Sequence, residues 1–182
     1  MTWDEDIAAT LASLWVPLRV LVWGPGLTSR AQWLEKRELV VAALREAAPR
    51  DEVRTSEDII ESTGDAGLDP GYVELVHAQH ADVIIVLALA SPDRQGGVYR
   101  ELEILAPHED LRPKVTVFLP NEKKWTNAFA AGALNRYEMS QKIHLDWDDF
   151  NACVRTRELS IARVEEVRRR RMYRKLDALP AQ

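Results

Sequence analysis

The chain has 182 residues, of which 46% are apolar and 29% are charged, and its formal net charge is −5. This balance is typical of a globular domain that buries its own core, and it excludes a wholly disordered chain. The acidic charge disfavours a dedicated nucleic-acid binder. The single cysteine cannot form an internal disulfide, and no secretory signal or membrane span is evident, so we expect a cytoplasmic protein.

Short apolar runs alternate with amphipathic stretches along the chain, which is typical of a layered α/β fold. The first half predicts a helix over 1–15, a strand over 18–23, a helix over 30–48, a strand over 52–55 and a short helix over 56–62. Next come a helix over 72–80, a continuous apolar strand over 82–90, a helix over 98–105 and a strand over 114–119. The last part predicts a helix near 127–139, a strand over 142–145 and a long helix over 148–176.

Five strands with intervening helices predict a flavodoxin-like three-layer sandwich with a parallel sheet in the order 2-1-3-4-5. We expect an N-terminal helical extension over 1–17 and an α/β domain over 18–146. A basic C-terminal helix over 147–182 is expected to pack on the same domain.

Two polar, glycine-bearing loops are expected at the crevice where the strand order reverses. Ligands bind open parallel sheets beyond the carboxyl ends of the strands, here between the first and third strands. The loop after the first strand contains Gly24, Pro25 and Gly26, and the loop after the third strand runs from Ser91 to Gly97. The glycines allow close approach of a ligand to the backbone, although a tight strand-to-helix turn explains the first loop equally well.

An acidic residue follows the second loop at position 101. Glu101 is expected near the start of the next helix, where the helix dipole favours a carboxylate. From the residues alone, Glu101 is either a functional carboxyl group facing the crevice or an ordinary acid of a helix N-terminus. Glu103 fits the second description equally well.

Three stretches of the chain resemble known families. An apolar strand over 81–87, Ser91, and the run Gly97-Val98-Tyr99-Arg100-Glu101 resemble Toll/interleukin receptor (TIR) domains and the nucleoside 2-deoxyribosyltransferase-like family. The opening run 19–26 and Thr55-Ser56-Glu57-Asp58 also look like TIR-like proteins. The resemblance covers roughly residues 18–145 in topology.

The resemblance implies an enzyme that breaks an N-glycosidic bond to a ribose. For TIR-like proteins this is the nicotinamide–ribose bond of NAD, which is then a substrate and not a cofactor, in a bacterial defence or signalling system. The alternatives are a nucleoside or nucleotide glycosidase or deoxyribosyltransferase, and a non-catalytic nucleotide-sensing or protein-interaction module. Homo-oligomerisation also belongs to what the resemblance implies.

The transition state of such a reaction carries positive charge at the anomeric carbon, which a carboxylate stabilises or attacks. Glu101 is the candidate for that role, and Asp93 is the candidate acid for a neutral leaving base. We expect Ser91 and Tyr99 to bind ribose hydroxyls or a ring. The candidate substrate-binding backbone is that of Gly24, Pro25, Gly26 and Gly97, with the first loop facing phosphate.

Two further groups of charged residues predict no catalytic site. His77 and His80 lie three residues apart, but without a third ligand they favour a structural pair over a metal site, and no metal is expected. The run Arg168–Arg171 makes the last helix basic and is expected to be a solvated face. Docking to a partner or a nucleic acid through these arginines is the alternative.

Overall fold

The computed structural model describes residues 3–26, 29–63, 69–90, 96–121 and 132–178, although a few side chains within these ranges are left undescribed. Five parallel strands form one sheet in the order β2-β1-β3-β4-β5, as the sequence predicts. They are β1 (Arg19–Trp23), β2 (Glu52–Thr55), β3 (Val83–Leu87), β4 (Val115–Pro120) and β5 (Lys142–Leu145). The fold is therefore a flavodoxin-like α/β sandwich.

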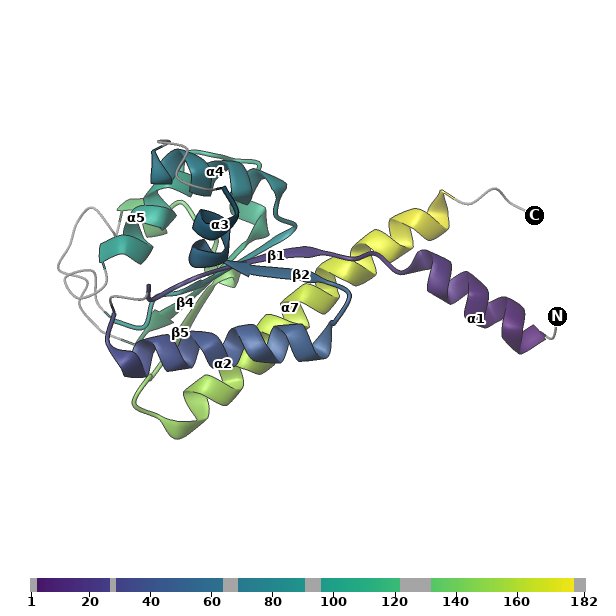
Figure 1. Ribbon diagram of the computed structural model, residues 1–182, viewed down its shortest axis with the longest axis horizontal. Coiled ribbons are helices and arrows are strands. Elements are labelled where there is room, and N and C mark those ends of the chain that lie inside the picture. The colour runs from purple at the N-terminus through teal and green to yellow at the C-terminus, as the bar shows by residue number, and fades with distance from the viewer. Residues whose placement is uncertain (1–2, 27–28, 64–68, 91–95, 122–131, 179–182) are drawn as a thin grey trace.

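Helices cover both faces of the sheet, so the central strands are apolar on both sides (Figure 1). The helices α3 (Ser56–Thr63), α4 (Pro70–His80) and α5 (Gly96–Leu105) pack on the face that contains Leu21, Ile84 and Val117. The helices α2 (Ala31–Ala47) and α7 (Phe150–Asp177) pack on the opposite face. Both faces are closed by apolar side chains, and this fixes the register of the sheet.

Helix ends follow the local signals of the sequence. Asp69 caps α4, accepting hydrogen bonds from the backbone of Gly71 and Tyr72 at 2.9 and 3.2 Å, and Pro70 takes the first helical position. Asp149 caps α7 in the same way, accepting from the backbone of Asn151 at 2.9 Å. Short 3₁₀ turns, η1 (Arg112–Lys114) and η2 (Met139–Gln141), precede β4 and β5.

Two predicted elements differ from the observed ones. The strand predicted over 82–90 ends at Leu87, and residues 88–90 stay buried while the chain leaves the sheet. The apolar run therefore marks burial and not strand length. Of the helix predicted near 127–139, residues 132–134 are helical, residues 135–138 form a turn and its end, and 127–131 lie outside the described residues.

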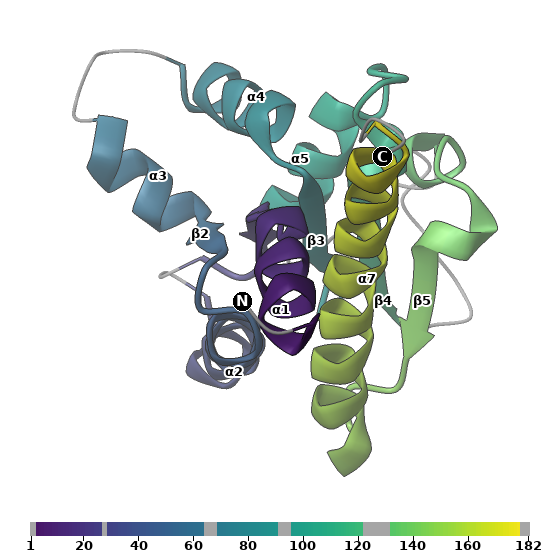
Figure 2. The same cartoon turned by 90° about the vertical axis from the view of Figure 1, so that its right-hand side faces the viewer.

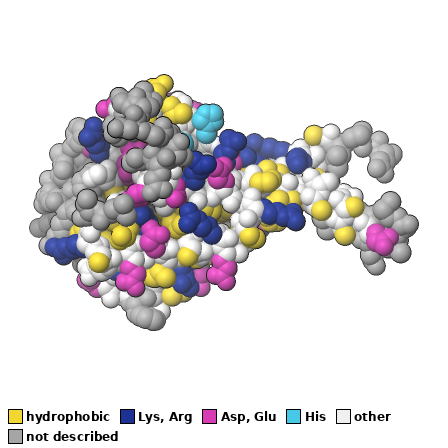
Figure 3. Space-filling view, in the orientation of Figure 1, with side chains coloured by type: hydrophobic (Ala, Val, Ile, Leu, Met, Phe, Trp, Pro, Cys, Tyr) yellow, Lys and Arg dark blue, Asp and Glu magenta, His cyan; other side chains and the backbone are white. Residues whose placement is uncertain are grey.

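The helix α1 (Trp3–Leu14) and the C-terminal part of α7 project together from the end of the sheet where the strands begin (Figures 1 and 2). The Lys175 ammonium donates to the backbone oxygen of Ser13 at 3.3 Å and links the two helices. Figure 3 shows basic side chains along this part of α7, together with hydrophobic side chains on the projecting helices. Within the described residues, no helix combines the length and apolarity needed to cross a bilayer.

The expected solvated face over Arg168–Arg171 is wrong for Arg168, which is 1% exposed. Its guanidinium forms ion pairs with Asp51 and Glu165 and lies 4.4 Å from the centre of the Trp15 ring. Asp51 also accepts a hydrogen bond from the backbone of Leu18 at 3.1 Å. The pair therefore fastens α7 to the residues that precede β1 and β2.

Arg171 makes a second link of the same kind. Its guanidinium contacts the carboxylate of Asp82 at 2.5 Å, and Asp82 accepts from the backbone of Arg19 at 2.8 Å. Position 82 precedes β3, so this pair ties α7 to the start of the central strands. Arg169 and Arg170 are exposed, and Arg170 forms an ion pair with Glu166 on the same helix.

Candidate functional site

The loop after β1 passes very close to the neighbouring strand and to α2. A Cβ added at Gly24 lies 3.3 Å from Cβ of Leu87, the last residue of β3, and 3.4 Å from Cδ of Arg37. These separations are tighter than ordinary contacts, so a larger residue at position 24 would have to displace Leu87 or Arg37 by a few tenths of an ångström. Gly24, Pro25 and Gly26 thus lie at the switch point between β1 and β3, where the sequence predicts them.

A buried ion pair lies beneath this loop. Arg37 of α2 is 3% exposed, and its Nη1 donates to both carboxylate oxygens of Glu57 at 2.8 and 2.7 Å. Its Nε and Nη2 donate to Oε1 of Glu38 at 3.1 and 2.8 Å. Burial alone would lower the pKa of Arg37, but the two carboxylates outweigh it and raise that pKa. Arg37 is therefore a fixed cation.

Glu57 is placed by a reciprocal cap at the start of α3. The backbone of Thr55 donates to the carboxylate of Asp58 at 2.8 Å, and the backbone of Asp58 donates to the Thr55 hydroxyl at 3.3 Å. Burial would raise the pKa of Asp58, but the hydrogen bonds from Thr55 prevail and lower it. This cap fixes the first turn of α3 directly after β2, and Oε1 of Glu57 lies 3.6 Å from a Cβ placed on Gly26.

Glu101 lies on α5, which follows β3, and its Oε2 atom is buried. Among the described residues no hydrogen-bond partner satisfies that oxygen. Burial raises the pKa of Glu101 well above its usual range, and the nearby charges of Glu74 and Glu57 raise it further. The charge of Arg37 lowers this pKa but does not outweigh the other effects. Glu101 therefore lies close enough to the Arg37–Glu57 pair for both charges of that pair to act on it.

Glu103, the alternative acid on the same helix, does not share this environment. Burial raises its pKa as well, but Arg100 is the charged neighbour that acts on it, and the crevice groups do not. The structure thus separates two acids that the sequence pattern leaves equivalent.

Glu74 of α4 also acts on Glu101, and no pattern in the sequence pointed to it. It is half-buried, and burial raises its pKa while Arg100 lowers it and Asp69 raises it. Arg37 and Glu57 were also absent from the predicted site. Two signals could have pointed to Glu57: its position just beyond β2, beside the switch point, and its place in the run 55–58 that resembles TIR-like proteins.

The remaining predicted residues have different positions. Tyr99 is 3% exposed, and its hydroxyl donates to the backbone oxygen of Ala90 at 3.0 Å, so it holds the start of the second loop. Gly97 is exposed in the first turn of α5, with nothing within 4 Å of a Cβ placed on it. Ser91 and Asp93 lie outside the described residues, and their roles stay predictions.

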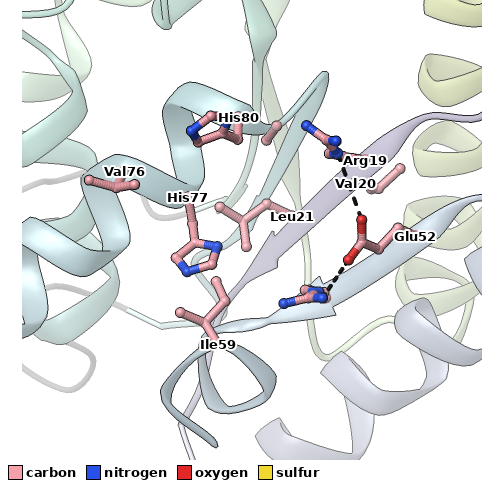
Figure 4. Close-up of a pocket in the computed structure, with 10 residues that line it drawn as sticks. Arg19, Val20, Leu21, Glu52, Ile59, Val76, His77 and His80 are labelled. Atoms are coloured by element: carbon pink, nitrogen blue, oxygen red, sulfur yellow. Dashed lines mark ion pairs between the residues drawn. The ribbon is translucent and has the colours of Figure 1, made fainter. Parts of the chain in front are cut away.

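The two histidines line a separate cavity of about 290 Å³ at the opposite end of the sheet (Figure 4). His77 and His80 of α4 face the first residues of β1 and β2, where Glu52 contacts both Arg19 and Arg54. Burial and the charges of Arg54 and His80 lower the pKa of His77, with Glu52 acting in the other direction. In the described part of the chain, no group of three or more potential ligands can hold a metal ion.

The fold and the position of Glu101 define a class: a flavodoxin-like α/β domain with a buried carboxyl oxygen beside its topological switch point. No protein-family profile and no curated protein matches the chain. Among solved structures, the chain is similar to a conserved protein from Enterococcus faecalis V583, with a TM-score of 0.45 and 14% identity. That likeness covers 85% of this chain and 99% of the other.

Proposed function

We propose that the crevice hydrolyses an N-glycosidic bond, with Glu101 acting at the anomeric carbon of a ribose. The proposed substrate is NAD, cleaved at its nicotinamide–ribose bond. One observation carries the proposal: Glu101 has a buried carboxyl oxygen without a partner among the described residues, at the place where this fold binds ligands. The resemblance to TIR-like proteins supports the same reaction.

The charges of the crevice suit the transition state of this reaction. As the C1′–N bond breaks, its electron pair moves to the cationic nicotinamide ring, which leaves as a neutral molecule. Positive charge then develops on the ribose, and water adds to C1′ and releases a proton. Burial is the main cause of the raised pKa of Glu101, and the carboxyl groups of Glu74 and Glu57 raise it further. These two acids supply negative charge that suits a cationic ribose.

The raised pKa of Glu101 links the proposed reaction to pH. A cationic nicotinamide ring beside the carboxyl group favours its ionised form, which is the form that stabilises a cationic ribose. We therefore expect NAD cleavage to rise with pH as Glu101 ionises, with a midpoint above the ordinary value of 4.5.

The same raised pKa favours a second candidate, a nucleoside or nucleotide glycosidase or transferase. A neutral base needs a proton to leave, and a buried, protonated Glu101 can donate one. In that case Glu101 acts as the general acid, and the rate falls as pH rises through its pKa. The two candidates thus predict opposite pH dependences for the same residue.

The experiment is to incubate the purified chain with NAD and, separately, with purine and pyrimidine nucleosides, and to quantify the released base across pH. Nicotinamide release that grows with pH supports the proposal. Release of nucleoside bases that declines with pH supports the second candidate. Binding of nucleotide without any release contradicts both and favours a nucleotide-sensing module.

Self-association and a role in bacterial defence or signalling belong to the same proposal through the resemblance alone. Specific activity measured over a range of protein concentrations tests the first of these. An activity per chain that rises with concentration supports assembly of the site by self-association, whereas a constant value contradicts it.

A further inference from the structure

Glu57 and Glu101 approach the loop after β1 from opposite sides. Glu57 follows β2 and Glu101 lies in the helix that follows β3, while β1 lies between these two strands. Adjacent strands are about 4.8 Å apart, so the strands that lead to the two acids are separated by roughly 10 Å. The charge of Glu57 acts on Glu101, and Oε1 of Glu57 lies 3.6 Å from a Cβ placed on Gly26, so the two carboxyl groups are near neighbours beside this loop.

The Glu57 carboxylate is suited to bind hydroxyl groups. One nitrogen of Arg37 donates to both oxygens of the Glu57 carboxylate. This fixes the Glu57 side chain but uses only part of the capacity of its oxygens to accept hydrogen bonds. The side chain of Glu57 remains 22% exposed, whereas that of Arg37 is 4% exposed. The group that a ligand meets is therefore an oriented acceptor, and its natural partner is a hydroxyl donor.

We infer that Glu57, held by Arg37, accepts a hydrogen bond from the 2′-hydroxyl of the sugar whose anomeric carbon faces Glu101. The site then takes ribosides in preference to 2′-deoxyribosides. The inference rests on the proposed function for the position of the anomeric carbon. Its chemical reason is general, because a hydrogen bond to the 2-hydroxyl strengthens as the ring becomes cationic.

This assignment separates the two families that the sequence resembles. NAD carries a complete ribose at the scissile bond, whereas 2-deoxyribosyl transfer needs a site that accepts a sugar without the 2′-hydroxyl. An ionised acceptor at this position favours the former, since its hydrogen bond is lost with a deoxy sugar.

The test is a comparison of binding and not of turnover. Calorimetry measures the affinity of the Glu101→Gln chain for nicotinamide mononucleotide and for its 2′-deoxy analogue, so that neither ligand is consumed. We expect the deoxy analogue to bind about 10- to 100-fold more weakly, as loss of one hydrogen bond to a charged group implies. Adding Glu57→Gln should reduce this gap to at most about threefold, because a neutral acceptor binds more weakly.

Two further variants keep the test clear of folding effects. Glu38→Gln removes the other carboxylate that pairs with Arg37 but leaves Glu57 in place. This variant should therefore keep the full difference in affinity between the riboside and its 2′-deoxy analogue. Glu57→Asp keeps the charge opposite Arg37 but shortens the side chain. For this variant the difference in affinity between the two ligands should be intermediate.

Equal affinity for the two ligands overturns the inference, as does binding of neither. A Glu57→Gln change that weakens both ligands by the same factor also overturns it, since that result means a general electrostatic effect. Failure of the proposed function has a different signature. In that case the wild-type chain releases no nicotinamide from NAD, yet the preference for the riboside persists.

Discussion

A carboxyl group at position 101 lies where its charged form is disfavoured, whereas two residues later a second carboxyl group lies outside the reach of the crevice charges. The sequence cannot separate these acids, because both follow the same loop on one helix. What separates them is first the stronger burial of the Glu101 carboxyl group and then the approach of Glu74 and Glu57 from other elements. A buried group of this kind lowers stability and is retained where chemistry needs it.

Replacing Glu101 with Gln should therefore stabilise the fold. The folded chain holds the Glu101 proton more tightly than the unfolded chain, so wild-type stability should decline as pH rises from about 4.5 toward the raised pKa. Glu101→Gln removes this decline, and we expect a gain of about 0.5–2 kcal/mol at pH 8 that vanishes near pH 4. Chemical denaturation at both pH values measures it. A variant less stable than wild type at pH 8 contradicts the burial of an ionisable group at this position.

A matched pair of glycines tests the close approach of the loop after β1. Gly24→Ala places a methyl group 3.3 Å from Leu87 within the sheet and should cost about 1–3 kcal/mol. Gly26→Ala meets Glu57 at an ordinary 3.6 Å and should leave stability nearly unchanged. Thermal unfolding of both variants measures the difference, and equal effects would contradict the described loop.

At the scale of elements, α7 is both a layer of the sandwich and a clamp on the starts of the strands. Charge runs are usually solvated, so the sequence predicts an exposed face and misses the buried Arg168. Its partner Asp51 lies far away in sequence and has a side chain that is fully buried. No local pattern reveals such a pair, because it forms only after α7 packs across the sheet.

Breaking this pair should be costly. Arg168→Leu leaves Asp51 buried without its cation, and we expect a loss of about 3–5 kcal/mol in the free energy of unfolding. Arg169→Leu, a change of the same type at an exposed neighbour, should cost less than about 0.5 kcal/mol. Urea denaturation of the two variants compares them. A small effect at Arg168 would mean that the clamp does not hold α7.

For the whole molecule, the order of the sheet was predictable because alternating strands and helices with right-handed crossovers leave few arrangements. The continuous apolar run predicted the buried strand β3. It did not predict where the strand ends, because residues 88–90 are also buried although they lie beyond the sheet. Topology predicted where a candidate site would lie, and Gly24, Gly26 and Glu101 follow the two strands that meet at this switch point. The Arg37–Glu57 pair and Glu74 were missed because they join the site through contacts between separate elements.

The role of Glu101 at the switch point can be measured by the release of nicotinamide from NAD by three matched proteins. Wild type and Glu103→Gln should release nicotinamide at similar rates, and Glu101→Gln should be slower by about 100-fold or more while remaining folded. Undiminished release by a folded Glu101→Gln chain would contradict the account, because the proposed chemistry would then proceed without the group assigned to it.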